Sequence, residues 1–108
     1  MWVHITIVRE TPARLEEIVE AGNTESFRNL LLNAPGFRGH YSLTNSDNPA
    51  EGYSISIWES AEEGRAFFAS AGYAQLMADY KDLITNPPQR LQFRMNWEIL
   101  SPKILKAV

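Results

Sequence analysis

Alternating apolar and polar residues mark four stretches of the chain, and this pattern predicts four β-strands. The stretches cover residues 2–8, 37–44, 54–58 and 89–100. β-Branched and aromatic residues are frequent in them, which is typical of strands. In 2–8 both faces carry more apolar than polar side chains, so we expect neither face of this strand to be plainly exposed to solvent.

Apolar residues at helical spacing separate the first two strands. Thr11 and Pro12 suit the start of a helix, because threonine accepts a hydrogen bond from a free backbone N–H and proline has no N–H to leave unpaired. The segment 34–36 ends the pattern. Gly22 and Asn23 lie in the middle, and the sequence leaves open whether they kink one helix or divide two.

A second helical region follows the third strand. Ser60 and Glu63 have the spacing of a capping box, in which each side chain satisfies a free backbone N–H of the other residue. Gly72 interrupts the apolar spacing, so we expect two helical pieces. The segment Asn86-Pro87-Pro88 ends the second piece, because proline cannot continue a helix.

The predicted order of elements is β-α-β-β-α-β. This order is typical of the ferredoxin-like, split β-α-β arrangement of the α+β class, in which helices cover one face of a four-stranded antiparallel sheet. The opposite face would carry large apolar side chains, and such a patch predicts a symmetric homodimer through the sheet. We expect residues 1–108 to form one domain, with 101–108 as a C-terminal tail.

Composition narrows the kinds of partner. The chain of 108 residues has a net charge of −3, which provides no basic surface for nucleic acid. Its apolar runs are shorter than the roughly 20 residues of a membrane span, so we expect no membrane segment and no signal peptide.

Because cysteine is absent, we expect a reducing compartment, the cytoplasm. The histidines and carboxylates have no metal-ligand spacing, and no strand precedes a glycine-rich phosphate loop, so we expect no metal and no cofactor.

Three short segments carry a family resemblance: 34–37 (APGF), 57–60 (IWES), and 66–73 with its Ala66-Phe67, Ser70 and Tyr73. Over roughly residues 1–100 the chain resembles the antibiotic biosynthesis monooxygenase family of dimeric α/β barrels. The resemblance implies a homodimer and a pocket between sheet and helices. The family includes cofactor-free monooxygenases that oxidise polycyclic phenols to quinones, quinol oxygenases, haem-degrading enzymes, and members without an assigned activity.

Three positions argue against the haem-degrading branch. That branch keeps an asparagine on the first strand, a tryptophan on the second helical region, and a histidine ligand further along the same region. With the segment 58–60 aligned, Phe67 stands at the tryptophan position and Met77 at the histidine position. His4 or Thr6 stands where the asparagine would be. The sequence therefore favours another chemistry.

Cofactor-free oxygenation requires a base that deprotonates the substrate, and histidine suits this task near neutral pH. His4 lies in the middle of the first strand, on the side of Thr6, and is the first candidate base; a buried histidine bonded to a neighbour is the structural alternative. His40 is the second candidate, with an exposed strand residue as the alternative. Arg38 is a candidate for stabilising an oxyanion, although such an arginine more often forms a surface ion pair.

Aromatic and soft apolar side chains recur from the third strand through the second helical region. Together with Thr6 they would line a pocket for a flat aromatic ligand, or they would form the core between helices and sheet. The members of this set are Trp58, Phe67, Phe68, Tyr73, Met77 and Tyr80.

Two functions fit these observations. The first is a homodimeric, cofactor-independent monooxygenase that oxidises a hydrophobic, electron-rich aromatic such as a polyketide phenol or quinol. The second is a non-catalytic dimer on the same fold that binds a small ligand or serves as structure, because fold alone does not decide function. An enclosed cavity reached by His4 or His40 would favour the first, and a filled interface would favour the second.

Overall fold

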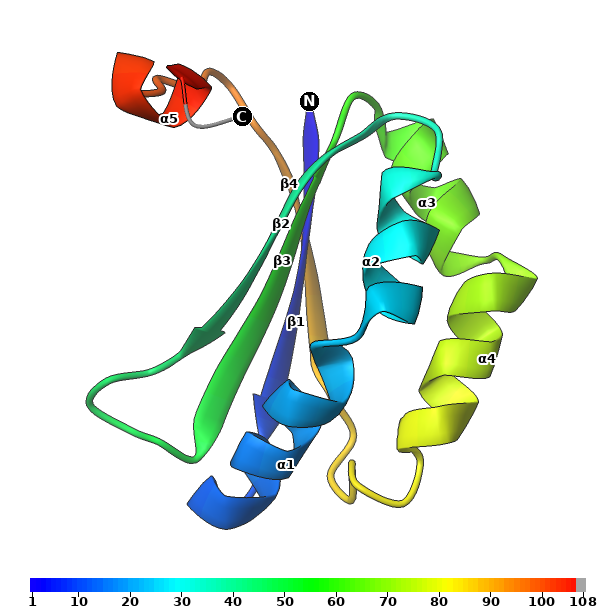
Figure 1. The fold of residues 1–108 in the computed structure, drawn as a ribbon, viewed down its shortest axis with the longest axis vertical. Helices are drawn as coiled ribbons and strands as arrows, with labels where there is room; N and C mark the ends of the chain where they lie inside the picture. The colour runs from blue at the N-terminus through cyan, green and yellow to red at the C-terminus, as the bar shows by residue number, and fades with distance from the viewer. Residues whose placement is uncertain (107–108) are drawn as a thin grey trace.

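The computed structural model describes residues 1–106. Its strands β1 (Trp2–Arg9), β2 (Phe37–Thr44), β3 (Glu51–Trp58) and β4 (Gln89–Arg94) form one antiparallel sheet in the order β2-β3-β1-β4. Four helices cover one face of the sheet (Figure 1): α1 (Pro12–Gly22), α2 (Glu25–Leu32), α3 (Ala61–Phe68) and α4 (Ala71–Tyr80). A short helix, α5 (Pro102–Lys106), lies in the predicted tail. The predicted ferredoxin-like α+β fold is confirmed.

Hydroxyl side chains begin each of the four helices. Thr11 and Ser60 accept hydrogen bonds from the third helical N–H of α1 and α3, as predicted, and Thr24 and Ser70 do the same for α2 and α4. The carboxylate of Glu63 accepts a hydrogen bond from the Ser60 hydroxyl at 2.9 Å. The prediction for Glu63 was a different bond, to the backbone N–H of Ser60.

The two helical regions are each divided. Gly22 and Asn23 separate α1 from α2, which answers the question that the sequence left open. The second region breaks at Ala69–Ser70, ahead of Gly72, because Ser70 provides the cap for a new helix. Gly72 lies inside the first turn of α4, where it packs closely against Leu30 of α2.

Strand β2 contains a bulge that changes which side chains share a face. Phe37 pairs with Trp58 and Gly39 with the preceding residue of β3, so Arg38 is an extra residue. Strict alternation along residues 37–44 would put Phe37 on the same face as Tyr41. Because of the bulge, Phe37 lies on the helix side, with its ring centroid 5.5 Å from that of Trp58.

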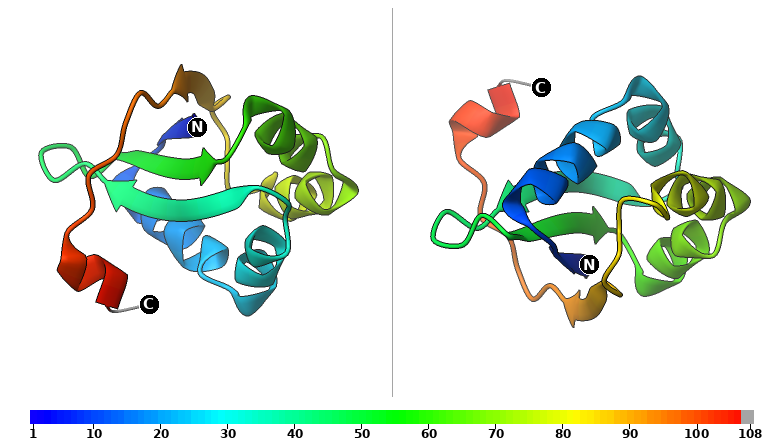
Figure 2. Two further views of the ribbon diagram at one scale, coloured as in Figure 1. Left: turned by 90° about the horizontal axis from the view of Figure 1, so that it is seen from above. Right: turned by 90° about the horizontal axis from the view of Figure 1, so that it is seen from below.

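Strand β4 is shorter than predicted. It ends at Arg94, and the Met95 N–H makes a last bond to the Met1 carbonyl at 2.9 Å. The alternation continues to residue 100, but in residues 1–106 no neighbouring strand runs beside 96–100. This segment instead passes toward the opposite edge of the sheet (Figure 2), where Glu98 pairs with Arg38 of β2 at 3.0 Å. Its Trp97 side chain is 75% exposed.

The two faces of the sheet have opposite character. The open face carries apolar side chains from all four strands, among them Ile5, Ile55, Tyr41 and Phe93, and the last two are about half exposed. The helix-covered face holds the core around Trp58, with Trp2, Leu31 and Phe67. In residues 1–106 no helix has the length and apolar character to cross a membrane.

Candidate functional site

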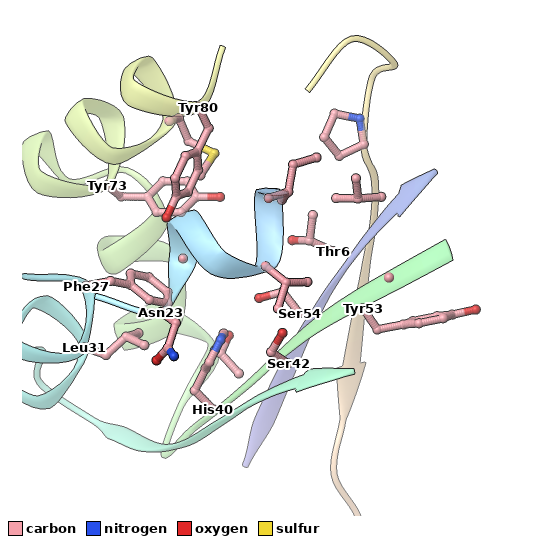
Figure 3. A pocket seen from close by; sticks show the side chains of 18 of the residues that line it. Thr6, Asn23, Phe27, Leu31, His40, Ser42, Tyr53, Ser54, Tyr73 and Tyr80 are labelled. Atoms are coloured by element: carbon pink, nitrogen blue, oxygen red, sulfur yellow. The ribbon is translucent and has the colours of Figure 1, made fainter. Parts of the chain in front are cut away.

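A cavity of about 700 Å³ lies between the sheet and the helices α1, α2 and α4 (Figure 3). Its sheet side is mostly polar and its helix side mostly apolar. The polar side includes Thr6, His40, Ser42, Ser54, Ser56 and Arg90. The apolar side includes Leu15, Ile18, Phe27, Leu31, Phe67, Phe68, Tyr73, Met77, Tyr80 and Ile84.

The polar side is built from a row of residues that are direct partners across all four strands. Ser42 of β2 pairs with Ser54 of β3, which pairs with Thr6 of β1, which pairs with Arg90 of β4. Polar side chains beneath a layer of helices are unfavourable unless they form hydrogen bonds. Here they face a cavity, so they are available to a ligand.

His40 reaches this cavity from the neighbouring row, between Phe27 and the serines (Figure 3). Its ring lies edge-on to Phe27, with the centroids 5.3 Å apart. In the described part of the chain, its Nδ1 is the one buried side-chain nitrogen or oxygen without a hydrogen-bond partner. Burial lowers the pKa of His40 below its usual value, so the ring is neutral at pH 7 and can accept a proton.

His4 lies on the predicted side of β1 but not on the cavity wall. Its side chain is 4% exposed, and Phe68 stacks on the ring with the centroids 3.8 Å apart. Burial, and next the positive charge of Arg90, lower its pKa to about 4. Phe68 itself lines the cavity, so it separates His4 from any ligand there.

Two other predicted site residues also lie away from the cavity. Trp58 is completely buried in the core, where its Nε1 donates to the Ser56 hydroxyl at 2.9 Å. Arg38 lies at the β2 bulge and pairs with Glu59 and Glu98. These hydrogen bonds and charges raise the pKa of Arg38.

The remaining predicted pocket residues line the cavity: Thr6, Phe67, Phe68, Tyr73, Met77 and Tyr80. Both tyrosine hydroxyls are already engaged. The Tyr73 hydroxyl accepts from Nη1 of Arg90 at 2.8 Å, and the Tyr80 hydroxyl donates to the Ala21 carbonyl at 3.0 Å. Phe67 and Met77 stand at the positions where haem-degrading relatives have tryptophan and histidine, and both side chains line the cavity.

Sequence reasoning missed Arg90 and the two serines of the row, Ser42 and Ser54. A signal was present in β3, where serine alternates with large apolar residues. That alternation marks one face of the central strands as polar, and the helices cover that face. Within residues 1–106 no group of three or more histidine, aspartate or glutamate side chains is placed to hold a metal ion.

The comparison with protein families agrees with this arrangement. A family model described as antibiotic biosynthesis monooxygenase matches residues 3–79, which is more than half of the chain. The chain therefore belongs to the antibiotic biosynthesis monooxygenase family. No curated protein matches it.

Solved structures share the fold at low sequence identity. A monooxygenase from the gene ActVA-Orf6 of Streptomyces coelicolor, solved with nanaomycin D, is 21% identical with a TM-score of 0.79, covering 93% of this chain and 91% of that chain. A Bordetella bronchiseptica protein named for the same family is 22% identical with a TM-score of 0.73, covering 89% and 97%. A Nitrosomonas europaea protein of unknown function is 15% identical with a TM-score of 0.73, covering 93% of each chain.

Proposed function

We propose that the protein is a cofactor-independent monooxygenase that oxidises a hydrophobic, electron-rich polycyclic aromatic in the cavity. The observation that carries this proposal is His40, whose buried Nδ1 has no partner at the wall of an aromatic cavity. Membership of the family and the monooxygenase name of one structural neighbour support it. The cavity volume of about 700 Å³ falls in the usual range of small-molecule sites.

The chemistry needs a base, a place for an anion, and protection from water. His40 removes a proton from the acidic C–H or O–H of an anthrone, phenol or quinol, and the anion delocalises over the rings. With an anthrone, the anion gives its electrons to O2 and a C–O bond forms. The O–O bond then breaks, one oxygen remains as the new carbonyl, and the other leaves as water with the two hydrogens lost from the ring carbon.

The substrate itself supplies all the electrons in this reaction, so no reductant is needed. The hydroxyls of Thr6, Ser42 and Ser54 donate hydrogen bonds to the oxyanion of the deprotonated substrate. The aromatic wall, which includes Phe27 and Phe68, packs against the rings and excludes water.

We also propose a homodimer in which the open sheet faces of two protomers pack together. Tyr41, Leu43 and Phe93 are each about half exposed on this face, and a contiguous apolar face of this kind marks an interface. Light scattering at micromolar concentration measures the oligomeric state, and a monomer contradicts this part of the proposal. With no cysteine in the sequence, the cytoplasm is the proposed compartment.

The test is oxygen consumption with a panel of anthrones and quinols. His40→Gln and His4→Gln form a matched pair, because both residues lie on the helix side of the sheet and in the same cross-strand row as Ser56. We expect His40→Gln to lower kcat by about 10²-fold or more, the usual contribution of a general base. His4→Gln should stay within a few-fold of the native protein once its folding is verified by circular dichroism.

The outcomes separate the alternatives. The reverse result, with activity lost in the folded His4→Gln variant alone, assigns the base to His4. Binding of the aromatic compounds without oxygen uptake from any of them favours the non-catalytic module. Because burial lowers the pKa of His40, the native rate should hold below pH 6.5, the ordinary histidine value, and fall only at more acidic pH.

A further inference from the structure

Arg90 differs from the ion-paired arginines of this protein. Arg9, Arg14 and Arg38 each lie within 4.0 Å of a carboxylate oxygen. Among the described residues no carboxylate pairs with Arg90, although its side chain lines the cavity. Its partner is Tyr73, whose hydroxyl accepts from Nη1 at 2.8 Å and whose ring centroid lies 5.9 Å from the guanidinium carbon.

This arrangement orients the guanidinium without neutralising it. A tyrosine hydroxyl is uncharged at pH 7, and it uses one of the five N–H donors that an arginine provides. Guanidinium groups bind carboxylates with two parallel hydrogen bonds, because the two planar groups match in shape. The remaining donors of Arg90 are therefore suited to an anionic group at the β4 edge of the cavity.

Other charges at the cavity point the same way. Arg28 of α2 also lines it, and its Nη1 donates to the uncharged Asn23 side chain at 2.8 Å. Glu20 of α1 is the carboxylate in the lining, and it pairs with neither arginine in the described residues. The cavity lining thus contains two guanidinium groups and one carboxylate, so a negatively charged ligand is favoured.

We propose that Arg90 is a specificity-determining residue that selects aromatic ligands bearing a carboxylate. This inference rests on the proposed function for the identity of the site. Arg90 lies on β4 and His40 on β2, three strand spacings apart, or roughly 14 Å at about 4.8 Å per spacing. A carboxylate bound at Arg90 therefore fixes one end of the ligand. The hydroxyls of Thr6, Ser54 and Ser42 then bind oxygens along the ligand, so that its other end reaches His40.

The test compares two ligands of nearly the same shape, anthraquinone-2-carboxylate and the neutral anthraquinone-2-carboxamide. Their Kd values are measured by quenching of tryptophan and tyrosine fluorescence, without any oxidation. We expect the native protein to prefer the carboxylate about tenfold, the equivalent of one charge-assisted hydrogen bond. This preference should shrink as the salt concentration rises.

Three variants test whether Arg90 supplies the positive charge that selects the carboxylate ligand. Arg90→Gln should bind both ligands equally, and Arg90→Lys should keep part of the preference because it retains the charge but not the fork. Arg94→Gln is the matched control, because Arg94 lies on the same side of β4 but outside the cavity lining, and it should behave like the native protein. Circular dichroism verifies that each variant is folded.

Several results would overturn the inference. Equal affinity of the native protein for both ligands removes the anion selectivity. A preference that survives in Arg90→Gln, or that disappears only in Arg28→Gln, shows that Arg90 serves as a structural brace for Tyr73. Because the binding assay needs no turnover, loss of the preference in Arg90→Gln would support the role of Arg90 even if no substrate consumed oxygen. Conversely, equal turnover of acidic and neutral substrates would contradict the inference and leave the oxygenase proposal intact.

Discussion

Helices α3 and α4 follow one another in the chain and lie over the same face of the sheet, yet they contact it differently. α3 buries Gly64 and Phe67 against a dense group of aromatic rings around Trp58. α4 has no buried residue, and the cavity lies between it and the sheet. One half of the helix layer therefore supplies stability, and the other half leaves room for a ligand.

The size of the side chains on the helix side of β1 accounts for this difference. Trp2 lies beneath α3, whereas Thr6 faces the cavity. Gly64 allows α3 to approach, because a Cβ at this position would collide with the Trp2 ring. Beneath α4, Thr6 and its cross-strand partner Ser54 are small and leave space unfilled. The gradient from large to small residues along one strand thus produces a core at one end and a cavity at the other.

Truncating a side chain in the core half and truncating one in the cavity half should have very different effects on the free energy of unfolding. Trp58→Ala removes the most buried side chain of the core, and we expect the free energy of unfolding to fall by about 4 kcal/mol. Met77→Ala removes a side chain that borders the cavity and should cost only about 1 kcal/mol, because fewer packing contacts are lost. Urea denaturation measures both values, and equal losses would contradict the division into a core half and a cavity half.

Acid should weaken the core half through His4. Its pKa is about 4 in the folded protein, against 6.5 for an unperturbed histidine, so the unfolded chain binds a proton more readily between these values. Stability is therefore complete above pH 6.5 and falls as the pH drops toward 4, by up to about 3 kcal/mol from this residue. His4→Phe should flatten the dependence of the free energy of unfolding on pH in this range, and an unchanged slope would contradict the assignment.

The smallest effect is expected at the contact between α4 and α1. Tyr80→Phe removes the hydrogen bond to the Ala21 carbonyl and should lower stability by about 1 kcal/mol. Because this bond connects two helices on either side of the cavity, the off-rate of a bound anthraquinone should rise a few-fold in stopped-flow fluorescence. Tyr41→Phe, a matched change on the open face and outside the cavity lining, is the control and should keep the native off-rate. An unchanged off-rate in Tyr80→Phe would contradict a role for this bond in holding the ligand.

Local chemistry in the sequence was enough to predict most of the fold. The caps at Thr11 and Ser60, the proline stop after Asn86, and the apolar periodicity all act within a few residues, so they can be recognised without a structure. The length of β4 and the bulge at Arg38 could not be predicted this way. Both depend on which backbone runs alongside, and a strand's own sequence does not contain that information.

The candidate site shows the same limit at the level of side chains. Periodicity placed His4 on the same side of β1 as Thr6, but only the packed structure shows that the helices cover this side and that Phe68 stacks on the ring. Phe67, Tyr73, Met77 and Tyr80 were predicted as pocket residues because helical spacing puts them on one side. His40 and Arg90 reach the cavity from opposite edges of the sheet, and their relation appears only once the strand order is known.

By itself the sequence determined the kinds of elements, their order and the family resemblance, because these depend on hydrogen bonding and periodicity along the chain. The tertiary structure decided which histidine faces the cavity, that Trp58 belongs to the core, and that Arg90 lies across the sheet from His40. These outcomes depend on the order and register of strands distant in sequence, and on which ring fills which space. Those are properties of packing, and packing is settled only when all the elements are in place.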